Sequence, residues 1–90
     1  MKDFEINISP DCVSEEMDSQ AIILNIKTGM YHELNQTGTI IWNEIKAEKI
    51  KKSVLVTRLN NKFNRNDLED DINDFLERML EKKIILVEEI

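Results

Sequence analysis

The chain has 90 residues, of which 41% are hydrophobic and 33% are charged, and its formal net charge is −6. A chain of this length buries only about 60% of its unfolded surface, so we expect a single domain over residues 1–90 with a modest core. The composition excludes an intrinsically disordered chain, and so small a core argues against a deep catalytic cleft.

The sequence contains one cysteine, which excludes an internal disulfide and suits a reducing compartment. No apolar run approaches the length of about 20 residues that a membrane span needs. The first five residues lack the apolar region of a signal peptide. We therefore expect a cytoplasmic protein.

The charge is unevenly distributed along the chain. Residues 1–42 carry two basic and seven acidic side chains, and residues 66–90 carry three basic and nine acidic ones. Residues 43–65 reverse this balance, with seven basic side chains against two acidic ones. The protein is thus acidic at both ends and basic in the middle.

The first part of the chain predicts strands. Residues 12–17 form a candidate short strand, and an Asp-Ser turn follows. Residues 21–26, AIILNI, are apolar and β-branched and lie between turn residues, which indicates a buried strand. Residues 27–29 suit a three-residue hairpin loop with its glycine in the left-handed conformation, so residues 30–35 are expected to return as the partner strand.

Two helices are expected next. The first covers about residues 37–47, and Asn35 or Thr37 can cap it by accepting from an amide of the first turn. The second covers about residues 51–63. The apolar residues of each helix fall on one face by the i, i+3, i+4 rule: Ile41, Trp42 and Ile45 in the first, and Leu55, Leu59 and Phe63 in the second.

The third helix has the clearest pattern. Asn66 is its expected cap, and Glu69 three residues later makes a variant of the capping box. Acidic residues stand at the start of the helix and Arg78, Lys82 and Lys83 at its end, an order that complements the helix dipole. The apolar stripe of this helix consists of Leu68, Ile72, Phe75, Leu76, Met79 and Leu80.

Residues 84–90 close the chain as a strand or an extended tail. The order of three strands followed by three helices predicts an α+β fold, in which a three-stranded antiparallel sheet packs with three helices. We find no internal repeat or linker that would divide the chain.

The sequence offers little material for catalysis. Cys12 and His32 are the only thiol and imidazole, and no third residue is evident that would orient them as a nucleophile pair. One His and one Cys do not fill a zinc site, and with two glycines there is no phosphate-binding loop. We therefore expect no catalytic residue, no metal ligand, no cofactor and no enzymatic activity.

The basic segment suggests one alternative function, a winged-helix DNA-binding regulator. Phosphate contacts supply most of the free energy of DNA binding, and an acidic third helix would oppose them. The acidic residues of that helix are explained by its dipole and by solvation. An open sheet edge suggests a second alternative, the binding of a peptide as an added strand.

The stretch GMYHELNQTGTIIW, residues 29–42, resembles the signature of the PqqD-like family, the leader-peptide recognition domains of pathways that make peptide natural products. The matching pattern is a glycine, an aromatic residue, a Leu-Asn pair, a second glycine and an Ile-Trp pair. The resemblance extends over about residues 10–87. The residues that carry it are Gly29, Tyr31, Leu34, Asn35, Gly38, Ile41 and Trp42.

The resemblance implies a winged-helix-like fold without catalysis. It implies that the domain binds the leader region of a ribosomally made precursor peptide as an added β-strand, against the third strand and the third helix. It also implies that the domain presents this precursor to a maturation enzyme, such as a leader peptidase of a lasso-peptide pathway or a radical enzyme of a pathway such as pyrroloquinoline quinone synthesis. Of the two we favour the lasso type.

This geometry selects the candidate peptide-binding residues. Tyr31 and Leu34 lie three positions apart, so either a regular strand directs one toward the core and the other toward the groove, or a bulge intervenes. Phe75 is expected to line a groove that is open to solvent, whereas Asn35 and Trp42 are expected to act as a helix cap and a core anchor. The candidates are Met30, Tyr31, His32, Glu33 and Leu34 of the strand and Asp71, Phe75, Arg78 and Met79 of the helix.

Overall fold

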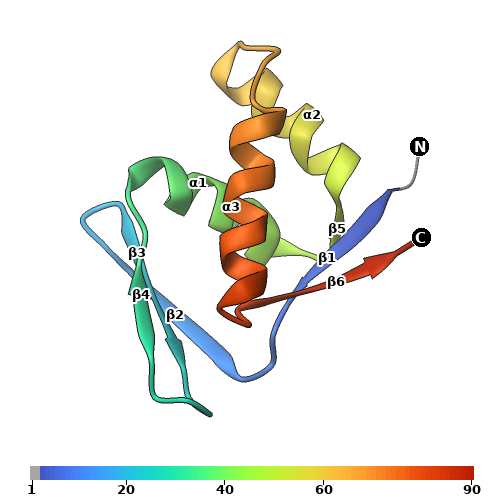
Figure 1. Cartoon of the computed structure of the whole chain (residues 1–90). Coiled ribbons are helices and arrows are strands. Elements are labelled where there is room, and N and C mark those ends of the chain that lie inside the picture. Colours follow the sequence, from blue (N-terminus) through green and yellow to red (C-terminus); the bar gives the residue numbers. More distant parts are fainter. Residues whose placement is uncertain (1–2) are drawn as a thin grey trace.

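The computed structural model describes residues 3–90, so the part of the expected 1–90 domain that falls on Met1 and Lys2 lies outside the described residues. Three helices and six strands follow one another in the described chain (Figure 1). In chain order they are β1 (Phe4–Ile8), β2 (Cys12–Met17), β3 (Gln20–Asn25), β4 (Tyr31–Glu33), α1 (Gln36–Ala47), β5 (Ile50–Lys51), α2 (Lys52–Phe63), α3 (Glu69–Glu81) and β6 (Ile85–Glu89).

The strands form two antiparallel sheets of three strands each. The sheet in the order β2-β3-β4 is the one that the sequence predicted. The second sheet has the order β5-β1-β6 and joins the two ends of the chain, with Phe4 opposite Glu89. The α+β class with three helices is confirmed, and the extended C-terminal segment is a strand.

Two tight turns shape the β2-β3-β4 sheet. Asp18 and Ser19 both have positive φ, as the two-residue turn between β2 and β3 requires. In the next loop, the side chain of buried Asn25 accepts from the amides of Lys27 and Thr28. Gly29 has φ +76, the left-handed conformation that the sequence predicted for it.

The junction between β4 and α1 is fixed by two side chains. Asn35 is the N-cap of α1, and its Oδ1 accepts from the Gly38 amide at 2.8 Å. One residue on, the buried Thr39 Oγ1 accepts from the amide of Ala21 in β3 at 2.8 Å. The Ala21 carbonyl in turn accepts from the Leu34 amide, so both backbone groups of one β3 residue hold this junction in place.

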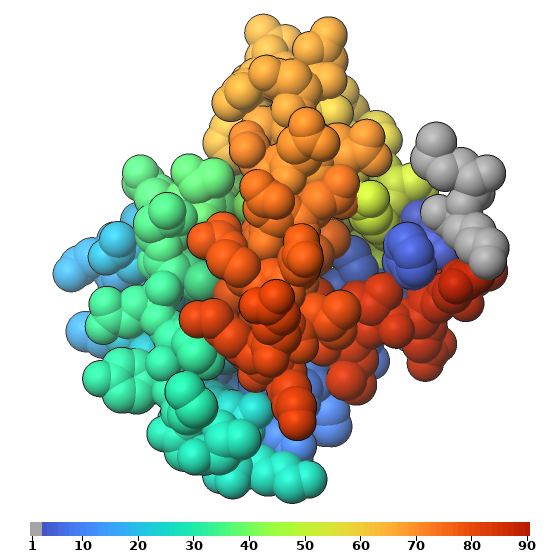
Figure 2. All heavy atoms as spheres, in the orientation of Figure 1, coloured from blue at the N-terminus to red at the C-terminus, as the bar shows by residue number. Residues whose placement is uncertain are grey.

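Helix α3 lies between the two sheets, with the β2-β3-β4 hairpins on one side and β6 on the other (Figures 1 and 2). Its apolar stripe is buried at Ile72, Phe75, Leu76 and Met79, whereas Leu80 is exposed. The same core contains Ile6, Ile23, Trp42, Leu55 and Ile85, so strands of both sheets and all three helices share one hydrophobic core.

The expected start of α3 is wrong. Leu68, not Asn66, is the N-cap residue, and it makes no side-chain cap. The Leu68 amide instead donates to Asn60 Oδ1 of α2, and buried Leu68 packs in the core. A tertiary contact therefore replaces the local capping box, although the acidic first turn of the helix is as expected.

The end of α2 also departs from expectation. Leu55 and Leu59 are fully buried, but Phe63 is 37% exposed at the last position of the helix. Asn64 follows with φ 54 as the left-handed C-cap, and its amide donates to the carbonyls of Asn60 and Asn61, so α2 ends at Phe63.

In residues 3–90, none of the helices combines the length and the apolar character that crossing a membrane would require.

The different burial of Trp42 and Phe63 predicts different costs for truncating the two aromatic side chains. Trp42→Ala should lower the free energy of unfolding by about 3–5 kcal/mol, because Trp42 is fully buried in the core. Phe63→Ala is the matched control and should cost about 1 kcal/mol, as for an ordinary substitution. Urea denaturation of both variants measures the difference, and equal costs would contradict the shared-core assignment of Trp42.

Candidate functional site

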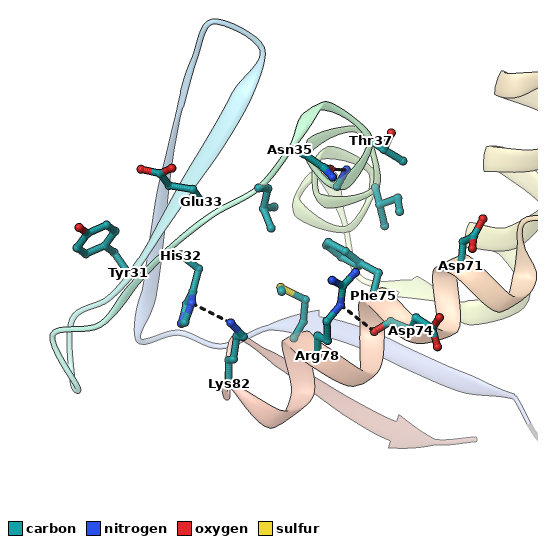
Figure 3. A pocket seen from close by; sticks show the side chains of 14 residues that line it. Tyr31, His32, Glu33, Asn35, Thr37, Asp71, Asp74, Phe75, Arg78 and Lys82 are labelled. Carbon is teal, nitrogen blue, oxygen red and sulfur yellow. Dashed lines mark hydrogen bonds between the residues drawn. The ribbon is translucent and has the colours of Figure 1, made fainter.

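A groove of about 800 Å³ lies between β4, the N-terminal end of α1 and one face of α3 (Figure 3). Strand β4 is the terminal strand of its sheet, so one of its backbone edges faces this groove. The lining residues are Tyr31, His32, Glu33, Leu34, Asn35, Thr37, Gly38, Ile41, Asp71, Asp74, Phe75, Arg78, Met79 and Lys82.

The floor of the groove is apolar. Leu34, Ile41, Phe75 and Met79 contribute to it, and all four are buried. Gly38 brings α1 and α3 together, since a Cβ at this position would lie 3.3 Å from Cε2 of the Phe75 ring. The absence of a side chain there allows the ring to pack directly against the first turn of α1.

The rim of the groove is charged, with opposite signs toward the two ends of α3. Asp71 and Asp74 lie toward the N-terminal end of the helix, and Arg78 and Lys82 lie toward its C-terminal end. The Nε of Arg78 donates a hydrogen bond to the backbone carbonyl oxygen of Asp74 at 3.4 Å, and the Arg78 side chain is exposed. The groove thus has an acidic end and a basic end.

His32 connects β4 to the end of α3. Its Nδ1 lies 3.3 Å from the Lys82 Nζ, a contact between residues 50 positions apart (Figure 3). Burial lowers the pKa of His32 below the ordinary value of 6.5, and the positive charge of Lys82 lowers it further. Both effects disfavour the imidazolium, so neutral His32 accepts from the Lys82 ammonium at neutral pH.

The backbone of β4 alternates between the two edges of the strand. The Asn25 amide donates to the Met30 carbonyl, and the Leu34 amide donates to the Ala21 carbonyl. Because hydrogen-bonded and non-hydrogen-bonded pairs alternate in an antiparallel ladder, His32 between them is also paired with β3. The amides and carbonyls of Tyr31 and Glu33 therefore point toward the outer edge.

Eight of the nine residues selected from the sequence line this groove, and Met30 does not. Met30 lies in the exposed loop before β4, where its carbonyl accepts from Asn25. Leu34 is buried and Tyr31 is 66% exposed, and both of them line the groove, so the two residues do not divide between core and groove. The expected solvent exposure of Phe75 is wrong, because the ring is only 3% exposed and belongs to the core.

Six lining residues were not among the sequence-selected candidates. Asp74 and Lys82 follow the α3 face of Asp71 and Arg78 at helical spacing, so a strict reading of the helical period would have included them. Asn35 is the expected helix cap, and the structure places it at the groove as well. The other three, Thr37, Gly38 and Ile41, line the groove because the start of α1 is near α3.

The structure gives no support to a Cys12–His32 nucleophile pair. Burial raises the pKa of the Cys12 thiol, which favours the unreactive protonated form. The sheet places β3 between the strands that carry the two residues. Among residues 3–90 there is no group of three or more His, Cys, Asp or Glu side chains that could hold a metal ion.

Most basic side chains of segment 43–65 are close to carboxylates. Ion pairs of this exposed kind add little stability, but they neutralise the positive field that a nucleic acid would need. The pairs are Lys49–Glu5, Lys52–Glu69, Arg58–Glu44, Arg58–Glu48, Lys62–Glu44 and Arg65–Asp67.

The lowered pKa of His32 predicts a loss of stability in mild acid. The unfolded chain binds a proton at an ordinary histidine pKa, whereas the folded chain binds it less readily, so the free energy of unfolding should fall as the pH drops through about 6.5. Urea denaturation at pH 7.5 and pH 5.5 measures this fall, which should be smaller in His32→Gln.

The chain has one histidine, so its imidazole titration can be followed directly by NMR. A His32 pKa at or above 6.5, or an unchanged pH dependence in His32→Gln, would contradict the role of Lys82 and burial.

Comparison with solved structures finds a similar protein, TbiB1, in its complex with the TbiA(beta) leader peptide. The TM-score is 0.79 and the sequence identity is 27%, over 88% of this chain and 93% of that chain. A search of curated proteins finds no match.

A comparison with models of protein families gives a match to coenzyme PQQ synthesis protein D (PqqD) over residues 20–85. The matched segment contains β3, β4, all three helices and thus every element that lines the groove. The fold, the motif at the β4–α1 junction and this match agree, and the chain belongs to the PqqD family.

Proposed function

We propose that this protein binds the leader region of a ribosomally made precursor peptide as a fourth strand beside β4 and presents it to a maturation enzyme. One observation carries this proposal: the outer edge of β4 faces a groove whose other wall is α3. Strand β2 is also terminal in its sheet, but it contributes no residue to this groove. The similarity to TbiB1, which was solved with a leader peptide, supports the same reading.

The backbone of β4 supplies the means of binding. Tyr31 and Glu33 direct their amides and carbonyls toward the outer edge, so a peptide strand can form hydrogen bonds with both residues. Alternate side chains of that strand would then point toward the floor formed by Leu34, Phe75 and Met79. Backbone pairing would provide affinity, and the floor would select an apolar side chain.

The charges of the rim can set the direction of the peptide. Asp71 and Asp74 would attract basic side chains of the leader, and Arg78 and Lys82 would attract acidic ones. A leader that carries opposite charges on either side of its apolar anchor therefore fits in one direction better than in the other.

The proposed role is binding without catalysis. The groove contains one imidazole, which is held by Lys82, and the single thiol lies outside it. The chemistry of maturation would then belong to the partner enzyme. A leader peptidase of a lasso-peptide pathway is our first candidate and a radical enzyme of a quinone-cofactor pathway is the second. We also propose that the domain acts in the cytoplasm.

The alternative of a winged-helix DNA-binding regulator has less physical support. Helix α3 begins with three acidic residues, and the basic side chains of α2 are paired with carboxylates. A formal net charge of −6 would further oppose binding to a polyanion.

Amide hydrogen exchange tests the added strand. With the leader of the precursor encoded beside this protein, the Tyr31 and Glu33 amides should exchange more slowly, because they gain hydrogen-bond partners. The His32 amide is the internal control, since β3 already protects it in the free protein.

The mass of the leader in the same sample tests the absence of catalysis. It should stay unchanged over time.

Amide protection confined to segment 43–65 would place the leader at that segment and would contradict binding beside β4. Tight binding of mixed-sequence duplex DNA at about physiological salt, without leader binding, would favour the regulator instead. A change in leader mass that is lost in Cys12→Ala would contradict the non-catalytic role.

Arg78→Glu tests the basic end of the groove. The exposed side chain should contribute little to folding, and reversing its charge should weaken leader binding by about tenfold, or about 1.4 kcal/mol. Lys46→Glu is the control, because it makes the same charge change at an exposed position outside the groove. Calorimetric titration with the leader should distinguish the two, and equal affinities would exclude Arg78 from the site.

A further inference from the structure

The outer face of the β2-β3-β4 sheet carries an apolar row of which only Tyr31, at the β4 edge, also lines the groove. The register places Val13 of β2, Leu24 of β3 and Tyr31 of β4 side by side across the three strands. Side chains alternate between the two faces of a strand, and the neighbours Ala21, Ile23 and Asn25 are buried. The row therefore points away from the core.

This row continues past the end of β3. Val13 is 53% exposed, and Ile26, two residues beyond Leu24 at the end of β3, is 61% exposed. Met17 is exposed at the far end of β2, on the same alternating face as Val13. Large apolar side chains gathered on one face of a small monomeric domain typically mark a protein-binding surface.

The charges around this face limit the partner. Glu15 and Glu33 lie opposite the two sides of Ile22, in the next row of the same face. Asp18 lies in the β2–β3 turn. A second copy would bring these carboxylates against one another, and like charges in an interface are costly. Nucleic acids and anionic membranes would be repelled for the same reason.

We propose that this outer face, centred on Val13 and Leu24, is the docking surface for the maturation enzyme, and that the enzyme contacts it with apolar side chains flanked by Lys or Arg. The identity of the enzyme rests on the proposed function. The chemistry of the contact rests on the apolar row and its acidic neighbours alone. The sheet would then use its β4 edge for the leader and its outer face for the enzyme.

The test measures two affinities for each variant: that for the leader, and that for each purified maturation enzyme encoded beside this protein. Val13→Lys should weaken enzyme binding by at least about tenfold, because it removes an apolar contact and adds a like charge. Glu15→Lys, at an exposed position of the same face, should weaken it as well. Leu86→Lys is the matched control, since Leu86 is an exposed apolar residue of β6 in the other sheet.

Leader binding by the same variants should stay unchanged, because neither Val13 nor Glu15 lines the groove. If the leader binds and no enzyme does, the docking face and the presentation to an enzyme are both wrong, and leader binding alone stands. If Leu86→Lys weakens enzyme binding as much as Val13→Lys does, the docking face alone is wrong and the proposed function stands. If the enzyme binds through this face and the leader does not bind, the proposed function is wrong and the docking face stands.

Sedimentation of the protein alone completes the test. A single monomeric species is expected at all concentrations. A concentration-dependent dimer that Val13→Lys dissociates would make a second copy the occupant of this face and overturn the proposal.

Discussion

The close packing of Phe75 against Gly38 is the contact on which the groove depends. A Cβ at position 38 would lie 3.2 Å from Asn35 Oδ1 and 3.3 Å from the Phe75 ring, so a side chain there would require the Asn35 side chain or the ring to move. With glycine at this position, α3 rests against the first turn of α1 directly beside the end of β4. This contact contributes to the spacing between the strand edge and the helix wall, because Phe75 belongs both to the core and to the groove floor.

The same junction also holds the strand. The Ala21 amide donates to the Thr39 hydroxyl, and the Ala21 carbonyl accepts from the Leu34 amide. Asn35 caps helix α1 at the same junction. A shift of β4 along β3 would break these bonds and would turn its side chains to the opposite face of the sheet. The edge presented to the groove is thus held in register by polar contacts, whereas the apolar core fixes the angle and depth of α3.

Charge divides the surface into regions with different roles. The basic residues of α2 are offset by nearby carboxylates, which leaves the acidic hairpins and the two charged ends of the groove as the stronger local fields. An edge that faces α3 and an outer face that carries an apolar row are separate surfaces of one three-stranded sheet. A small domain can therefore present two binding surfaces without enlarging its core, because the two faces and the edges of a sheet are independent.

Local pattern in the sequence determined the elements that line the groove. The hairpin glycine, the Asn35 cap and the apolar period of α3 each depend on residues within a turn or two of one another, and the structure has all three. Eight of the nine selected residues line the groove, and they were selected from the strand and helix that the family resemblance indicated. Tertiary structure alone decided the rest, because pairing across long separations leaves no local signal. It joined β1 to β6, replaced the Asn66 cap with a contact from Asn60, brought Lys82 to His32, and buried Phe75 beneath a glycine that lies far from it in the chain.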